Sequence, residues 1–182
     1  YLGSATSNGA VLTVLQKAEI TLNPVSRNIV LGNAATFTSS AIGTAPLSLQ
    51  WQKDGVNITG ATNAVYTIPS TAYADAGTFR IIASNAYGTD TSQAATLRVG
   101  LAVGIITQPV NFNGTAGENV TFTIEANGTA PLTYQWFKDD VAISSANTTE
   151  LKFKNVNPDF SGAYSVQVSN PFGEVTSRKA VL

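Results

Sequence analysis

The stretch TAPLTYQWFKDD, residues 129–140, has a close counterpart earlier in this chain. That counterpart is TAPLSLQWQKDG at residues 44–55, and every matching residue of the two stretches is displaced by 85. Trp51 and Trp136 are the only tryptophans, and each ends an alternating apolar run that closes in a Lys-Asp turn. The repeat therefore predicts two β domains, each with a central strand whose Trp points inward.

The 85-residue displacement also predicts the domain boundaries. A chain of 182 residues accommodates two such domains, which we place at residues 15–100 and 101–182. Residues 1–14 match the end of both repeats, so we interpret them as the last strand of an upstream repeat. The matched residues of this segment, which recur at each 85-residue step, are Gly3, Thr6, Ser7, Ala10 and Leu12.

Further strands follow from apolar residues at alternate positions. The segments 74–88 and 159–173, ADAGTFRIIASNAYG and DFSGAYSVQVSNPFG, predict a turn, a buried strand and a tight hairpin in each repeat. Residues 56–58 and 141–143 predict short edge strands. Ile20 and Ile105, each four residues before a proline, predict a first strand at the edge of a sheet.

Together these residues resemble immunoglobulin-like domains of the intermediate, or I-set, type. The resemblance rests on the glycine before the second strand, the Trp strand with its Lys-Asp turn, a Gly-x-aromatic corner and Ser-Asn-x-aromatic-Gly. The resemblance covers essentially the whole chain. The chain is also similar to the cysteine-free tandem copies of this domain in bacterial surface and secreted proteins. The resemblance implies an all-β fold of two tandem β-sandwiches with Greek-key topology, plus an extra N-terminal strand.

The chain departs from the family at its disulfide. In the family a Trp packs on an inter-sheet disulfide, and the resemblance places the cysteine positions at Ser39 with Ile81 and at Ile124 with Val166. Because the chain has no cysteine, apolar packing has to offset about 2–5 kcal/mol of lost stabilisation.

The corner residue differs between the repeats. The first has Phe79, whereas the second has Tyr164, whose hydroxyl can bond to the backbone. Because the first repeat also carries the hydroxyl of Ser39 at a core position, we expect the first domain to be the less stable one.

Composition excludes several classes of function. Without cysteine and histidine the chain lacks thiolate and imidazole ligands and the commonest general base. A net charge of -1 with 12% charged residues does not supply the basic surface that nucleic acid requires, and no apolar run is long enough to enter a membrane as a helix.

The carboxylates carry no predicted chemistry. The adjacent Asp139 and Asp140 fit a hairpin turn better than a metal pair, and Glu19, Glu118 and Asp159 form no calcium-ligand string. We therefore expect no enzyme activity, and no catalytic, metal or cofactor-binding residue.

Two aromatic residues are candidate ligand contacts. Tyr87 and Phe172 occupy the same hairpin position in the two repeats. One interpretation is that their rings are platforms for a sugar. The other is that they are structural residues that cover the end of each sandwich beside the connector. Their recurrence in both repeats favours the structural role.

Three functions remain open. The favoured one is a non-catalytic spacer or adhesive stalk of a bacterial surface or secreted repeat protein, whose partners are other repeats and an extracellular protein or glycan. A second is a carbohydrate-binding accessory module of a polysaccharide-degrading enzyme. A third is a self-assembling filament or layer subunit joined by strand addition through residues 1–14.

Overall fold

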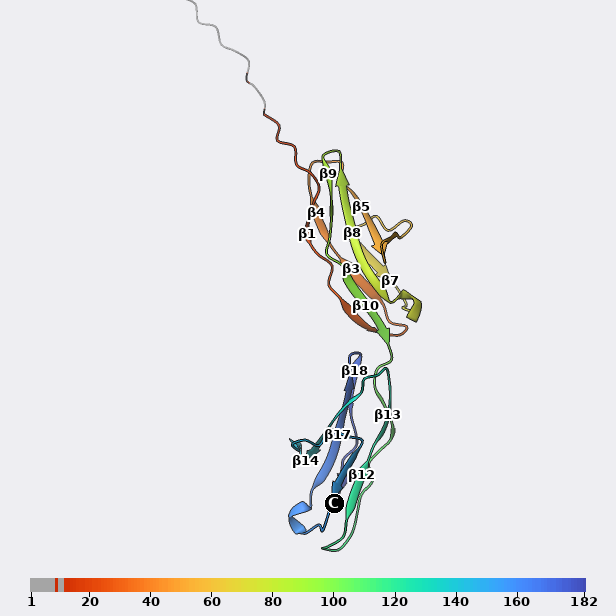
Figure 1. The fold of residues 1–182 in the computed structure, drawn as a ribbon, viewed down its shortest axis with the longest axis vertical. Helices are drawn as coiled ribbons and strands as arrows, with labels where there is room; N and C mark the ends of the chain where they lie inside the picture. Colours follow the sequence, from red (N-terminus) through yellow and green to blue (C-terminus); the bar gives the residue numbers. More distant parts are fainter. Residues whose placement is uncertain (1–8, 10–11) are drawn as a thin grey trace, which may run out of the picture. The chain divides into compact units, whose positions relative to one another are not determined.

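The computed structural model describes residue 9 and residues 12–182, and it is an all-β structure. Its strands pair in two separate sets, β1 to β10 and β11 to β19, which form two β-sandwiches (Figure 1). The predicted all-β fold of two tandem β-sandwiches is therefore confirmed. No helix in the described residues is long and apolar enough to cross a membrane.

The first sandwich is built around β8, which pairs with the Trp strand β5 on one side and with β10 on the other. The sheet order β2-β10-β8-β5-β6, with β9 paired to β8, brings strands that are distant in sequence side by side, as in a Greek key. Pairs β1-β4 and β3-β7 complete the fold. The strands are β1 (Glu19–Leu22), β2 (Arg27–Val30), β3 (Ala35–Thr38), β4 (Ser40–Ile42), β5 (Ser48–Lys53), β6 (Val56–Asn57), β7 (Val65–Ile68), β8 (Gly77–Asn85), β9 (Gly88–Thr91) and β10 (Ala95–Gly100).

The second sandwich repeats this plan around β17. The Trp strand β14 pairs with β17 in antiparallel register, and β18 and β19 also pair with β17. Pairs β11-β13 and β12-β16 complete it. The strands are β11 (Gly104–Thr107), β12 (Val120–Thr123), β13 (Glu125–Asn127), β14 (Thr133–Lys138), β15 (Val141–Ala142), β16 (Glu150–Phe153), β17 (Ala163–Asn170), β18 (Gly173–Thr176) and β19 (Ala180–Val181).

Both tryptophans are at the centre of a core, as predicted. Trp51 and Trp136 are 0% exposed. Each indole N–H donates to a backbone carbonyl, of Asn63 at 2.8 Å and of Thr148 at 2.9 Å, so burial leaves no polar atom without a partner. A phenylalanine ring packs near each Trp, with its centroid 6.1 Å from that of Trp51 for Phe37 and 6.3 Å from that of Trp136 for Phe122.

Buried side chains occupy the positions that correspond to the cysteines of the family that the sequence resembles. Ile81 lies opposite Trp51 in the β5–β8 register, and Val166 lies opposite Trp136 in the β14–β17 register. Both are at most 1% exposed. Ser39 is buried too, and its hydroxyl donates to the Leu22 carbonyl at 2.7 Å. This hydrogen bond offsets the free energy that burying the hydroxyl would otherwise cost.

The corner before the central strand is a short 3-10 helix in each sandwich, η1 (Tyr73–Asp75) and η2 (Pro158–Phe160). In the first, the Asp75 carboxylate accepts from the Ala72 N–H at 2.7 Å. In the second, the side chain of Asn157 takes over the capping by accepting from the Asp159 N–H at 2.9 Å. The Tyr164 hydroxyl donates to the Phe160 carbonyl at 2.6 Å, as the sequence predicted. Which sandwich is the more stable stays a prediction.

One strand of the first sandwich was not predicted. Residues Arg27–Val30 pair in parallel with β10, in the register Leu97↔Arg27 to Gly100↔Val30. The predicted upstream strand of residues 1–14 lies mostly outside the described residues, which include only Gly9 and residues 12–14 of it. Residues 12–18 carry no strand in the structure.

Candidate functional site

The connector that enters the first sandwich is held at Gln16 by two residues, Thr44 and Asn85. The Gln16 N–H donates to the Thr44 hydroxyl at 2.8 Å, and the Thr44 N–H donates back to the Gln16 carbonyl at 3.0 Å. The side-chain amide of Asn85 donates to the carbonyls of Gln16 and Thr44 at 2.8 and 2.9 Å. These bonds tie the entering chain to two points of the sandwich, and we call this arrangement the connector clamp.

The second sandwich has the same clamp 85 residues later. The Leu101 N–H donates to the Thr129 hydroxyl at 2.7 Å, and the Thr129 N–H donates to the Leu101 carbonyl at 3.1 Å. Asn170 donates to the carbonyls of Leu101 and Thr129, both at 2.9 Å. Because the clamped residues, Gln16 and Leu101, contribute only backbone atoms to these bonds, their side chains are free to differ.

Each clamp is positioned by a tight hairpin. Asn85 and Asn170 are the last residues of β8 and β17, and each lies opposite a glycine across a two-residue turn. Their side-chain oxygens accept from the N–H of Tyr87 at 3.0 Å and of Phe172 at 2.9 Å. One asparagine in each sandwich therefore holds both the hairpin tip and the connector.

The hairpin tips carry the two predicted ligand contacts. Tyr87 is 48% exposed, whereas Phe172 is half-buried. Both tips lie against the connector, because a side chain added at Gly88 would meet Lys17 Cβ at 3.2 Å. One added at Gly173 would meet Ala102 Cβ at 3.5 Å. The geometry supports the structural interpretation of this position, and a sugar-contacting role stays a proposal.

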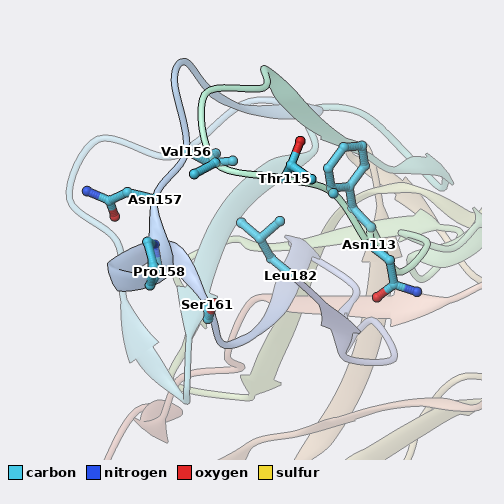
Figure 2. A pocket seen from close by; sticks show the side chains of 10 residues that line it. Asn113, Thr115, Val156, Asn157, Pro158, Ser161 and Leu182 are labelled. Atoms are coloured by element: carbon cyan, nitrogen blue, oxygen red, sulfur yellow. The ribbon is translucent and has the colours of Figure 1, made fainter.

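A groove of about 500 Å³ is present in the second sandwich. Val156 and Leu182 lie between the segment of Pro158 and Ser161 on one side and that of Asn113 and Thr115 on the other (Figure 2). No charged side chain lines the groove. The residues that line it are Phe112, Asn113, Gly114, Thr115, Ala116, Val156, Asn157, Pro158, Ser161 and Leu182.

The adjacent acidic residues form a turn, as predicted. Asp139 and Asp140 have φ values of 49° and 66°, which Asp tolerates in tight turns. The Asp139 carboxylate accepts from the Ala163 N–H at 2.9 Å, and Asp140 pairs with Lys179 at 2.7 Å. Within the described residues, no group of three His, Cys, Asp or Glu residues could hold a metal ion.

Hydrogen bonds lower the pKa of two carboxylates in the described residues, and burial raises the pKa of one tyrosine. The backbone N–H of Thr78, followed by its hydroxyl, lowers the pKa of Asp54. The N–H groups of Ile20 and Thr91 lower the pKa of Asp90, and burial raises the pKa of Tyr164. The two carboxylates stabilise backbone amides of turns and strand ends, which is a structural role.

Comparison with known families identifies the fold group. The family described as Immunoglobulin I-set domain matches residues 18–99 and 103–181. This chain belongs to the immunoglobulin I-set family. The I-set matches coincide with the two strand sets, and an I-set β-sandwich is typically not catalytic.

Individual relatives differ in source. The chain is 25% identical over 189 residues to Hemicentin-1 of Mus musculus, covering 97% of this chain and 3% of the relative. It is 31% identical over 114 residues to Endoglucanase C of Cellulomonas fimi, covering 60% of this chain and 10% of the relative. The I-set chain thus spans a small part of the relatives that it matches.

A solved structure shows the same tandem fold. Extracellular domains 3–5 of Drosophila OTK superpose with a TM-score of 0.76 at 23% sequence identity, covering 97% of this chain and 64% of that chain. At this identity the likeness concerns the fold alone.

Sequence reasoning missed the clamp. Thr44 and Thr129 open the repeated stretch, and Asn85 and Asn170 belong to the repeated Ser-Asn-x-aromatic-Gly segment, so all four were visible as recurring residues. Their contact was not visible, because the clamp bonds join residues 41 and 69 positions apart.

Proposed function

We propose that this chain is a non-catalytic spacer segment of a bacterial surface or secreted repeat protein. In this role two I-set sandwiches in series would hold whatever lies at their ends apart. The observation that carries the proposal is the duplicated connector clamp, since each entering connector is hydrogen-bonded to the sandwich that follows it. A clamped connector loses backbone freedom, which is what a spacer of defined length requires.

The test is the distance distribution between the two sandwiches. Because the chain has no cysteine, Thr62→Cys and Asn147→Cys, at equivalent exposed positions, place one fluorescent dye on each sandwich. Asn170→Ala should broaden the distribution of dye separations measured by single-molecule energy transfer. Asn85→Ala is the matched control, because it removes the same bonds from the connector that precedes both sandwiches. Equal distributions in all three proteins would contradict the spacer proposal.

A second candidate function is carbohydrate binding as an accessory module. It is favoured by the match to Endoglucanase C and by Tyr87, whose ring is 48% exposed at a hairpin tip. The test is calorimetric titration with a soluble glucan. Binding that disappears in Tyr87→Ala and persists in Tyr73→Ala, another exposed tyrosine, would support this function, and no heat of binding would exclude it for that glucan.

A further inference from the structure

The second sandwich has a further pocket of about 250 Å³, at the corner where η2 precedes β17. Its lining residues come from the end of β14, the residue after β15, the end of β16, η2 and the start of β17. It shares no lining residue with the groove of Figure 2. The residues that line this corner pocket are Lys138, Ile143, Phe153, Asp159, Phe160 and Tyr164.

Three aromatic rings belong to the lining of the corner pocket. The ring of Phe153 contacts those of Phe160 and Tyr164, with centroid separations of 5.2 and 5.4 Å. Phe153 and Phe160 meet edge to face, at 65°, and both are half-buried. Aromatic rings prefer such edge-to-face and offset contacts, so two partly exposed rings in this arrangement suit a further planar ring.

The first sandwich forms the same corner with other side chains. The 85-residue displacement matches Phe153 to Ile68 and Phe160 to Asp75. Asp75 serves the fold there, because its carboxylate accepts from the Ala72 N–H beside η1. Since a corner with a 3-10 helix forms in both sandwiches, the fold does not require the two phenylalanine rings. These rings are therefore available for another role in the second sandwich.

Lys138 is the only cation among the lining residues. Its ammonium donates to the Asp159 carbonyl, which anchors it at the pocket. An ammonium has three N–H donors, and Lys138 forms no ion pair within the part of the chain that the structure describes. The side chain of Asp159 is exposed, so water weakens its repulsion of an anion. The ammonium can therefore receive an anionic group.

Size and polarity restrict the ligand further. An apolar cavity of about 150 Å³ holds one benzene ring, so a pocket of about 250 Å³ holds one ring with a short substituent. The Tyr164 hydroxyl already donates to the Phe160 carbonyl, which leaves few lining groups to bond to the hydroxyls of a sugar. Polar groups buried without partners cost free energy. The pocket therefore favours an aromatic ring over a sugar.

We propose that the corner pocket binds a small aromatic carboxylate. The ring of the ligand packs against Phe153 and Phe160, and its carboxylate accepts from the Lys138 ammonium. Because the first sandwich has Ile68 and Asp75 in place of the two phenylalanines, the same ligand should not bind there. This ligand site does not depend on the spacer role, which concerns the connectors.

The first test is an NMR titration of the full chain with sodium benzoate. The amide signals of Ile143, Phe160 and Tyr164 should shift with a Kd of about 1 mM, as expected for a ligand of this size. Their counterparts 85 residues earlier should stay in place. Acetate and glucuronate supply a carboxylate without an aromatic ring, and each should bind more weakly than benzoate.

The titration also has outcomes that overturn the proposal. Amide signals that stay in place up to about 10 mM benzoate would exclude the site, because this concentration is well above the expected Kd. Equal shifts with acetate would show that the ring contributes nothing. Tighter binding of glucuronate than of benzoate would make the pocket a site for an acidic sugar instead.

The second test uses substitutions that separate the two contacts. Lys138→Gln should weaken benzoate binding about 10-fold, because it removes a charged hydrogen bond. Phe153→Ile introduces the residue of the first sandwich, and it should weaken binding about 2- to 10-fold through the loss of an aromatic contact. Lys53→Gln, at the equivalent position of the first sandwich, is the matched control and should leave binding unchanged. Full binding in Lys138→Gln, or weakened binding in the control, contradicts the proposed site.

Discussion

At the scale of single residues, the two sandwiches bury different side chains at the positions where the family has a disulfide. Ser39 and Ile81 occupy the cysteine positions of the first sandwich, and Ile124 and Val166 those of the second. The Ser39 hydroxyl bonds to Leu22. Hydrogen bonding therefore allows a polar residue where the second sandwich uses an aliphatic one.

Tyr164 gives a direct test of one such bond. Its hydroxyl donates to the Phe160 carbonyl at 2.6 Å, so Tyr164→Phe should lower the free energy of unfolding of the second sandwich by about 0.5–1.5 kcal/mol. Thermal unfolding followed by calorimetry measures this. The control is Tyr73→Phe, at a tyrosine that is 56% exposed, and it should leave both transitions in place. A shift of equal size in the control would contradict the assignment.

Asp54 should make the stability of the first sandwich sensitive to acid. The N–H of Thr78 lowers the folded-state pKa of Asp54 below its ordinary value of 3.8. The stabilisation by this carboxylate is therefore full above pH 3.8 and is lost as the pH falls through the lowered folded-state pKa.

Asp54→Asn removes this titration. The difference in the free energy of unfolding between the unaltered protein and the variant should shrink as the pH is lowered through and below 3.8. Chemical denaturation at several pH values measures it. A difference that stays constant with pH would contradict this role of Asp54.

At the scale of elements, the hairpin and the connector act together. Asn170 lies directly before the turn of the β17–β18 hairpin. Its side chain donates to the Leu101 carbonyl in the connector and to the Thr129 carbonyl at the start of the repeated stretch. Strand, turn and connector thus share one set of hydrogen bonds, so local opening at the hairpin should also release the connector.

Thr129→Val tests this element directly. It removes the acceptor of the Leu101 N–H, which should then exchange with solvent about 2- to 10-fold faster, corresponding to the loss of one hydrogen bond. Amide hydrogen exchange measured by NMR reports it. Thr44→Val is the matched control, because it should accelerate exchange at Gln16 and leave Leu101 unchanged.

At the scale of the whole molecule, each sandwich has a core of its own. The aromatic contacts of the first sandwich join Phe37, Trp51, Tyr66 and Phe79. Those of the second join a separate set, Phe122, Trp136, Phe153, Phe160 and Tyr164. Separate cores predict that the two sandwiches unfold in independent steps.

A matched pair of substitutions at the cysteine positions tests this independence. Ile81→Val and Ile124→Val each remove one methyl group from a core, at residues that are 1% and 5% exposed. Each should cost about 0.5–1.5 kcal/mol and lower one calorimetric transition while leaving the other in place. If either substitution moves both transitions, the sandwiches unfold as one unit.

The sequence by itself determined the repeat, the strands around each Trp, the tight hairpins and the family. These features depend on side-chain alternation and turn residues within about ten positions, or on the constant displacement of 85 between matching residues. Trp51 and Trp136 were predicted to be buried for this reason, and Tyr164 was predicted to bond to its corner.

Only the tertiary structure decided the rest. The clamp of Asn85 joins residues 41 and 69 positions apart, and the parallel pairing of β2 with β10 joins Arg27 to Leu97. The groove of the second sandwich brings together Gly114, Val156 and Leu182, which are distant from one another in the sequence. Such contacts depend on the register between distant strands, which alternation along one strand does not encode.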